Sequence, residues 1–305
     1  MGTAGLIFYR YHDELDRARN AAQHGGIVVN TQAGPIAESG AGIPLLSIHG
    51  AGGGYDQGLA NAAGLVGEGF RVIAPSRFGY LRTPIPPDTS PAAQADAHAA
   101  LLSRLNVGRA IVVGVSAGAR SAVELAIRHP TSVAALILIV PGTYSPTSPV
   151  SVEASRGSQL VFWAVNAGAD FSWWALEKIA PSVLVRFVGV KPEVLAAAGS
   201  AEQDRIMGII RAIEPLSRRF PGINVDSSSA LHEVALQEIT MPTLVISARD
   251  DLFNTLPAAE FAASRIPSAK LVVYDSGGHL LVGHERETRE AVRIFLASAG
   301  LVAQP

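Results

Sequence analysis

Short apolar, β-branched runs alternate along the chain with longer stretches in which apolar residues recur at helical spacing. Most of the short runs lack polar alternation, which is typical of parallel strands covered by helices on both faces. The pattern therefore predicts an α/β fold. The predicted strands span residues 27–30, 45–48, 71–74, 110–115, 134–140, 243–247 and 270–274, and the predicted helices span residues 91–105, 117–128, 257–265 and 284–297.

The strand-then-helix order is interrupted between about residues 143 and 229, a segment that opens on several prolines and then becomes helical and aromatic. We predict that residues 1–142 and 230–305 form the core domain and that residues 143–229 form an inserted helical cap. Charged residues interrupt the cap too often for a membrane span. Its aromatic residues either pack the cap against the core domain or line an apolar acyl or alkyl pocket. These aromatics are Phe162, Trp163, Phe171, Trp173 and Trp174.

Composition narrows the classes of function. A chain of 305 residues with 48% hydrophobic residues can bury a large core. With 24 Lys and Arg against 26 Asp and Glu, and no long run of like charge, a nucleic-acid partner is disfavoured. Because cysteine is absent, disulfides, thiolate metal sites and cysteine nucleophiles are excluded. We take a cytoplasmic location as the default.

The first residues form an apolar stretch that is too short to span a bilayer and lacks the preceding charges of a secretory signal. We predict a short leading helix there. Leu6 stands where a myristoylation signal needs Ser or Thr, which disfavours lipidation. The same patch also fits the end of a membrane anchor, were the natural chain to begin further upstream.

The strongest local signal lies in AIVVGVSAGARSAVELAIRHP, where a β-rich run meets GVSAG, residues 114–118, and turns at once into a helical pattern. This order is the context of a nucleophile elbow, in which a strained turn presents a serine. The flanking glycines avoid collisions, and the helix N-terminus favours developing negative charge. Because GxSxG alone is a frequent chance match in a glycine-rich chain, the assignment of Ser116 as nucleophile depends on further motifs.

A second motif, LLSIHGAGGGYDQG, places His49 at a strand end and follows it with small residues. Such a loop leaves main-chain N–H groups uncovered, and acyl transfer needs two of them aimed at the oxygen that becomes negative. We assign these donors to Ala51 and Ala117. A phosphate-binding loop is the alternative, but the Lys and Ser/Thr of a P-loop and the spacing of a dinucleotide fingerprint are missing. His49 precedes the nucleophile, and we expect it to shape the turn.

The general base is sought among the eight histidines. His279 stands out because it ends a Ser-Gly-Gly-His loop directly after the last apolar strand. His284 is the nearest competitor, but it begins the terminal helical pattern. The acid that orients the base should lie on another strand-end loop, and MPTLVISARDDLFNT supplies both Asp250 and Asp251. We prefer Asp251, since Asp250 is better suited to bind its own backbone in a turn.

The chain resembles the α/β-hydrolase superfamily through HGAGGG, GVSAG, the SARDD strand end and the GGH loop, which follow the family's order and cover nearly the whole chain. The resemblance implies an eight-stranded, mostly parallel sheet with helices on both faces and a cap after the sixth strand. It also implies a triad of Ser116, Asp251 and His279 without cofactor or metal. Haloalkane dehalogenases and epoxide hydrolases of this fold use an aspartate at the position of Ser116, so these activities are disfavoured.

One segment departs from the family, because PSRFGYLRT stands where many relatives have Asp-x-Arg-Gly-x-Gly-x-Ser; Arg77 and Arg82 remain candidates for a structural role. We expect hydrolysis of an apolar, ester-like small molecule through an acyl-enzyme. The same machinery serves thioesters, lactones, amides, perhydrolysis and the carbon–carbon bonds of vinylogous diketones. A slow small-molecule receptor and a scaffold with an idle triad are the alternatives outside enzymology.

Overall fold

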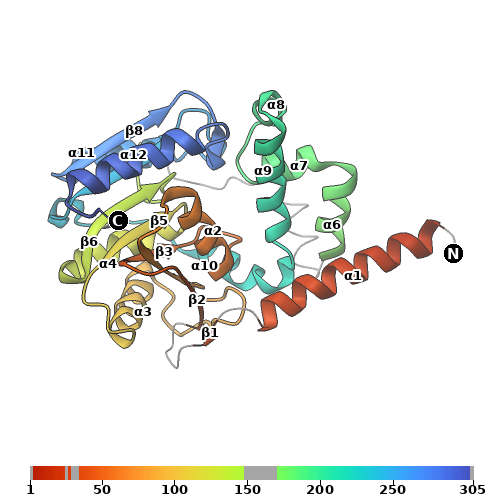
Figure 1. Ribbon diagram of the computed structural model, residues 1–305, viewed down its shortest axis with the longest axis horizontal. Helices are drawn as coiled ribbons and strands as arrows, with labels where there is room; N and C mark the ends of the chain where they lie inside the picture. The colour runs from red at the N-terminus through yellow and green to blue at the C-terminus, as the bar shows by residue number, and fades with distance from the viewer. Residues whose placement is uncertain (1–2, 25–26, 29–33, 148–169, 303–305) are drawn as a thin grey trace.

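The computed structural model describes residues 3–24, 27–28, 34–147 and 170–302. Within these residues eight strands form one sheet in the order β1-β2-β4-β3-β5-β6-β7-β8 (Figure 1). Strands β3 to β8 pair in parallel, and β2 pairs antiparallel with β1 and β4. The predicted eight-stranded, mostly parallel sheet is confirmed. The strands are β1 Ile27–Val28, β2 Pro35–Ser39, β3 Ile43–Ile48, β4 Phe70–Pro75, β5 Ala110–Val115, β6 Val133–Ile139, β7 Thr243–Ala248 and β8 Ala269–Tyr274.

Helices cover both faces of the sheet, because neighbouring residues of each central strand point to opposite sides and nearly all are apolar. Leu46 and Val112 pack with helices α3, α4 and α11 on one face, whereas Leu45 and Ile111 pack with α2 and α12 on the other. The four predicted helices begin and end within one residue of the observed ones. The helices are α2 Tyr55–Leu65, α3 Pro91–Arg104, α4 Gly118–Arg128, α11 Leu256–Arg265 and α12 Glu285–Ser298.

Between β6 and β7, the described residues 170–228 are mainly helical, and we call their helices α6 to α10 the cap. Helices α6 to α9 stand beside the sheet, on the side of the N-terminal helix (Figure 1). Leu184, Ile206 and Ile210 form a buried core of their own with neighbouring apolar residues, joined by Tyr80 of the core domain. The cap helices are α6 Asp170–Ile179, α7 Pro181–Phe187, α8 Pro192–Ala197, α9 Ser200–Ala212 and α10 Phe220–Ser228.

The aromatic residues of the cap that the structure describes pack within the cap and against the N-terminal helix. Trp173 is buried in the cap core, where its indole N–H donates to the carbonyl oxygen of Ile210 at 3.2 Å. Trp174 and Phe171 pack against Tyr11 of helix α1. Phe162 and Trp163 lie outside the described residues.

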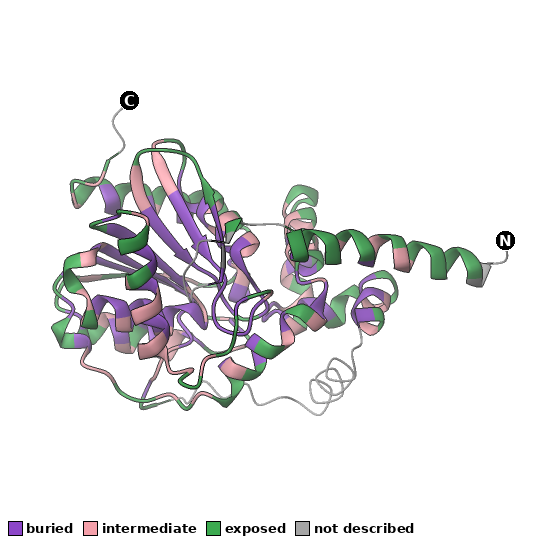
Figure 2. Ribbon diagram, turned by 90° about the horizontal axis from the view of Figure 1, so that it is seen from below, coloured by how far each residue is buried: buried purple, intermediate pink, exposed green. Residues whose placement is uncertain are grey.

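Helix α1, Thr3–His24, confirms the predicted leading helix, but at 22 residues it is not short. Its first half projects away from the body and is exposed (Figure 2). Its second half contacts the cap, where the carboxylate of Glu14 accepts from the indole N–H of Trp174 at 2.7 Å. Across the described residues, none of the helices combines the length and the apolar character that a bilayer crossing requires.

Candidate active site

Ser116 lies in the turn that joins β5 to α4, with φ at +51°. This left-handed backbone is unfavourable for a residue with a side chain and persists only where neighbours hold it. Here the N–H of Ser116 donates to the carbonyl of Ile139 at 2.9 Å, and its own carbonyl accepts from Gly142 at 2.9 Å and from Ala119 at 3.0 Å. The end of β6 and the first turn of α4 therefore hold the strained serine.

The glycines on either side of Ser116 permit two close approaches. A methyl group built on Gly118 would lie 2.4 Å from the carbonyl oxygen of His49, and one on Gly114 would lie 2.6 Å from Cβ of Ala122. Both distances are shorter than real carbon contacts. Helix α4 can thus begin directly against the β3 loop, which brings the loop after His49 beside the serine.

The structure brings His279 and Asp251 together at the ends of β8 and β7. Nδ1 of His279 lies 2.8 Å from Oδ2 of Asp251, and both side chains are buried. The carboxylate also accepts from the N–H of Phe253 at 2.8 Å and from the hydroxyl of Thr255. Burial on its own would raise the pKa of Asp251, but the charge and hydrogen bond of His279, with the other two donors, lower it. The acid is therefore a carboxylate that can orient the imidazole.

Asp250, the neighbouring carboxylate, has a different partner. Its Oδ1 accepts the N–H of Gly278 at 2.7 Å. Asp250 thus binds backbone, as expected of a turn residue, but the backbone is that of the histidine loop and not its own. His284, the competing base, precedes α12 as expected and stacks on Tyr274, with ring centroids 4.1 Å apart.

The cap contacts this pair through Gly189, which sequence reasoning missed. The Gly189 carbonyl accepts from the N–H of His279 at 3.0 Å and from the N–H of Leu252 at 3.2 Å. Its φ is +82°, and a methyl group here would lie 2.5 Å from Cβ of His279. Phe253 completes the enclosure, with its ring edge-on to the imidazole at 4.6 Å. An isolated glycine between two short helices was the available signal, but nothing local identifies its partner.

Ala51 and Ala117 carry the predicted oxyanion donors. Gly50 packs so closely that a methyl group on it would lie 3.1 Å from Cβ of Ser116, so the loop runs beside the serine. Three other N–H groups of the loop have acceptors within the protein. That of Gly50 donates to Gln57 Oε1 at 3.0 Å, that of Gly52 to the Tyr80 hydroxyl at 3.4 Å, and that of Gly53 to the Gly50 carbonyl at 3.3 Å. Among the described residues, the N–H groups of Ala51 and Ala117 have no acceptor. Both are therefore free to bind a ligand oxygen.

His49 is fully buried beneath this loop, and its surroundings fix its tautomer. Burial and the charge of Arg77 hold the pKa of His49 well below its usual value, so the ring is neutral. Nδ1 donates to the Gly50 carbonyl at 2.7 Å, and Nε2 accepts the N–H of Arg77 at 2.9 Å. With both nitrogens occupied, His49 braces the turn, as predicted.

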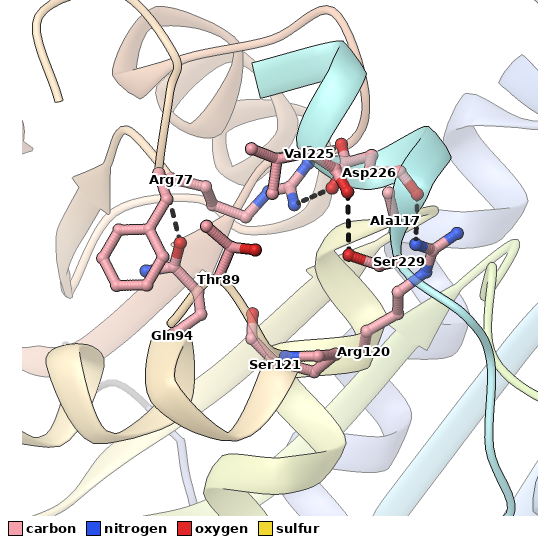
Figure 3. Close-up of a pocket in the computed structure, with 11 residues that line it drawn as sticks. Arg77, Thr89, Gln94, Ala117, Arg120, Ser121, Val225, Asp226 and Ser229 are labelled. Carbon is pink, nitrogen blue, oxygen red and sulfur yellow. Dashed lines mark hydrogen bonds and ion pairs between the residues drawn. The ribbon is translucent and has the colours of Figure 1, made fainter. Parts of the chain in front are cut away.

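A buried ion pair behind the elbow was also missed. Both terminal nitrogens of Arg77 donate to the carboxylate of Asp226 on α10, at 2.7 and 2.6 Å (Figure 3). Burial would raise the pKa of Asp226, but Arg77, together with Arg120 and Tyr80, lowers this pKa below its ordinary value. The pair borders a small polar pocket that reaches Ala117, with Ser121 and Ser229 among its lining residues. Sequence reasoning left Arg77 as a structural candidate and gave Asp226 no role.

The family model described as the α/β hydrolase fold matches residues 43–284. The chain belongs to this family. Among curated proteins, this hydrolase is 30% identical to a 2-hydroxymuconate semialdehyde hydrolase of Pseudomonas sp. strain CF600, over 87% of this chain and 91% of that protein. It is 29% identical to a pimeloyl-[acyl-carrier protein] methyl ester esterase of Aromatoleum aromaticum, over 69% of this chain and 81% of that protein. Among solved structures, an α/β hydrolase fold protein from Nakamurella multipartita has a TM-score of 0.71 and 29% identity, covering 90% of this chain and 99% of that one.

In the hydrolase fold, residues from distant segments lie at the same edge of the sheet. Ser116, Asp251 and His279 each follow the carboxyl end of a parallel strand, where open α/β sheets form their sites. No group of three or more His, Asp or Glu residues in the described chain could hold a metal ion. The chemistry available at this edge is that of a serine, a histidine–carboxylate pair and uncovered amides.

Proposed function

We propose that this hydrolase cleaves a carboxylic ester of a small apolar molecule through an acyl-enzyme on Ser116. The observation that carries the proposal is the 2.8 Å contact between Nδ1 of His279 and Oδ2 of Asp251, with both groups buried. The contact requires that Nδ1 carry the proton, which leaves Nε2 as the basic nitrogen. The strained backbone of Ser116 supports its role as nucleophile.

In the first step, His279 Nε2 takes the proton of the Ser116 hydroxyl while Oγ attacks the carbonyl carbon. The carbonyl oxygen becomes negative and is bound by the N–H groups of Ala51 and Ala117. When the tetrahedral intermediate collapses, the alcohol leaves with the proton from His279. Water then attacks the acyl-enzyme by the same route, with His279 as base, and releases the acid and free Ser116.

Hydrolysis of a carbon–carbon bond is the second candidate, favoured by the identity to the 2-hydroxymuconate semialdehyde hydrolase. The triad and the oxyanion donors would act in the same way on the ketone carbonyl. The difference lies in the leaving group, since a carbanion needs electron withdrawal by the substrate and a proton on carbon. We rank the ester first because its alkoxide leaving group needs only the proton that His279 already holds.

A fluorophosphonate probe tests the shared chemistry, because it phosphonylates only an activated serine. We expect stoichiometric labelling at Ser116, and no labelling or ester turnover by a folded Ser116→Ala variant. A folded wild type that resists the probe would contradict the proposal. Initial rates on p-nitrophenyl esters of increasing acyl length, beside a 2-hydroxy-6-oxo-dienoate, then separate the two candidates, since the preferred class should have the higher kcat/KM.

A further inference from the structure

The carboxylate of Asp226 connects the cap to the core domain. It lies on α10, is buried, and binds two residues of the loop that follows β4. Arg77 donates both terminal nitrogens to it, and the hydroxyl of Tyr80 donates to its Oδ2. Burial and the negative charge of Asp226 raise the pKa of Tyr80, so its hydroxyl keeps the proton that it donates.

Arg77 and Tyr80 in turn hold the oxyanion loop on both sides of Ala51. On one side, Nε of Arg77 donates to the His49 carbonyl at 2.9 Å, and the Arg77 backbone N–H binds the His49 ring. On the other side, the Tyr80 hydroxyl accepts the N–H of Gly52 at 3.4 Å, and the Tyr80 ring lies edge-on to His49 at 4.7 Å. The residues on either side of Ala51, His49 and Gly52, are therefore held by Arg77 and Tyr80, and both of these side chains bind Asp226.

The second oxyanion donor has a link to the same residue. Arg120 on α4 donates Nη1 to the backbone carbonyl of Asp226 and Nε to the carbonyl of Gly142, each at 2.8 Å. The N–H of Gly142 in turn binds the carbonyl of Ser116, whose next residue is Ala117. Figure 3 shows Arg77 and Arg120 approaching Asp226 from opposite sides of the pocket that Ala117 borders.

We infer that Asp226 of the cap is a positioning residue for the oxyanion hole, acting on Ala51 through Tyr80 and Arg77. The inference rests on the proposed acyl chemistry. An oxyanion donor acts only when it is aimed at the position that the oxygen takes in the transition state, and loss of one costs about 10²–10³ in kcat. Loosening the loop without removing the donor should cost less, and should affect kcat more than KM because the donor binds the transition state preferentially.

Tyr80→Phe is the variant of choice because it removes one hydroxyl without leaving a buried charge unpaired. Tyr55→Phe is the matched control, since Tyr55 is also a buried tyrosine, but its hydroxyl donates to the Ala21 carbonyl of α1 at 3.0 Å. We expect Tyr80→Phe to lower kcat for a p-nitrophenyl ester about tenfold with KM within about twofold, and to weaken an alkyl boronic acid inhibitor by a similar factor. Tyr55→Phe should leave all three values unchanged. Equal kcat values in the two variants would overturn the inference.

The role of Asp226 is tested by Asp226→Asn and by the double variant that combines Asp226→Asn with Tyr80→Phe. If Asp226 acts through Tyr80, the double variant should lose little more kcat than the more impaired single variant. Multiplication of the two losses would overturn the inference. Should Asp226→Asn fail to fold, the comparison of Tyr80→Phe with Tyr55→Phe still tests whether the contact between Tyr80 and Asp226 positions the oxyanion loop.

One readout does not depend on turnover. In ¹⁵N–¹H spectra, Tyr80→Phe should shift the amides of Ala51 and Gly52, whereas Tyr55→Phe should not. Unshifted amides would overturn the positioning role. Failure of the fluorophosphonate to label the wild type would overturn only the proposed function, because the amide shifts report the position of the loop either way.

Discussion

Replacing Gly189 by alanine should displace His279, the proposed base, without substituting any residue of the proposed triad. The Gly189 carbonyl binds the backbone N–H of His279 and of Leu252, so one cap residue joins the histidine loop to the acid loop. A methyl group would stand 2.5 Å from Cβ of His279 and 2.9 Å from the Phe253 ring. The Phe253 ring can turn aside, but Cβ of His279 can move only with its backbone.

The size of the effect follows from two costs. An alanine held at a φ of +82° costs about 1–2 kcal/mol of folding free energy. Relief of the contact by shifting the cap or the histidine loop adds about 1–3 kcal/mol. An ordinary carbon–carbon contact is about 3.5–4.0 Å, so the required movement is on the order of 1 Å, a displacement that costs about 10²-fold in rate. Activity should therefore fall much further than the folded fraction.

The assay is kcat on a p-nitrophenyl ester, beside the free energy of unfolding in urea so that only folded enzyme is counted. Gly208→Ala is the matched control. Gly208 lies inside α9 with nothing within 4 Å of the added methyl group, so alanine should stabilise the helix by about 0.5–1 kcal/mol and leave kcat unchanged. If Gly189→Ala retained wild-type kcat to within twofold, the cap would not be holding the base, and the reasoning would be refuted.

Two further predictions concern carboxylates. Asp251→Asn should lower kcat by about 10⁴, because an amide next to His279 Nδ1 favours the wrong tautomer. Asp250→Asn keeps an acceptor for the N–H of Gly278, so its kcat should stay within about tenfold of the wild-type value. A larger loss for Asp250→Asn than for Asp251→Asn would contradict our assignment of the acid. Burial and the charge of Glu177 raise the pKa of Glu214 to about 7, so the folded protein binds this proton more tightly than the unfolded chain does. The contribution of Glu214 to stability should therefore fall as pH rises from about 4.5 to about 7. Glu214→Gln should therefore raise Tm at pH 8 and not at pH 5, and an equal gain at both would refute the cause.

The parts of the fold that were predictable are those in which the signal is local. The central strands read as unbroken apolar runs because both of their faces are buried. The GVSAG turn could be predicted because a strained turn needs small neighbours. Gly118 confirms this, since any side chain there would collide with the His49 carbonyl. Strand β2 was missed because PIAES begins on proline and carries Glu38, whose carboxylate pairs with Arg71 across the strands at 3.0 Å. Helix α2 was missed because its start, after Gly54, lacks a capping side chain.

The contacts of the cap with the core could not be predicted from the sequence, for a different reason. Asp226 lies 149 residues from Arg77, and neither belongs to a spacing that chemistry would recognise. Gly189 matters only because the histidine loop passes beside it. The proposed triad, in contrast, lies at the ends of parallel strands, whose places the fold determines in advance. Gly189 of the cap binds the His279 backbone, and Asp226 of the cap is linked to the oxyanion loop through Arg77 and Tyr80. We therefore expect a substrate that shifts the cap to change the rate of chemistry as well as binding.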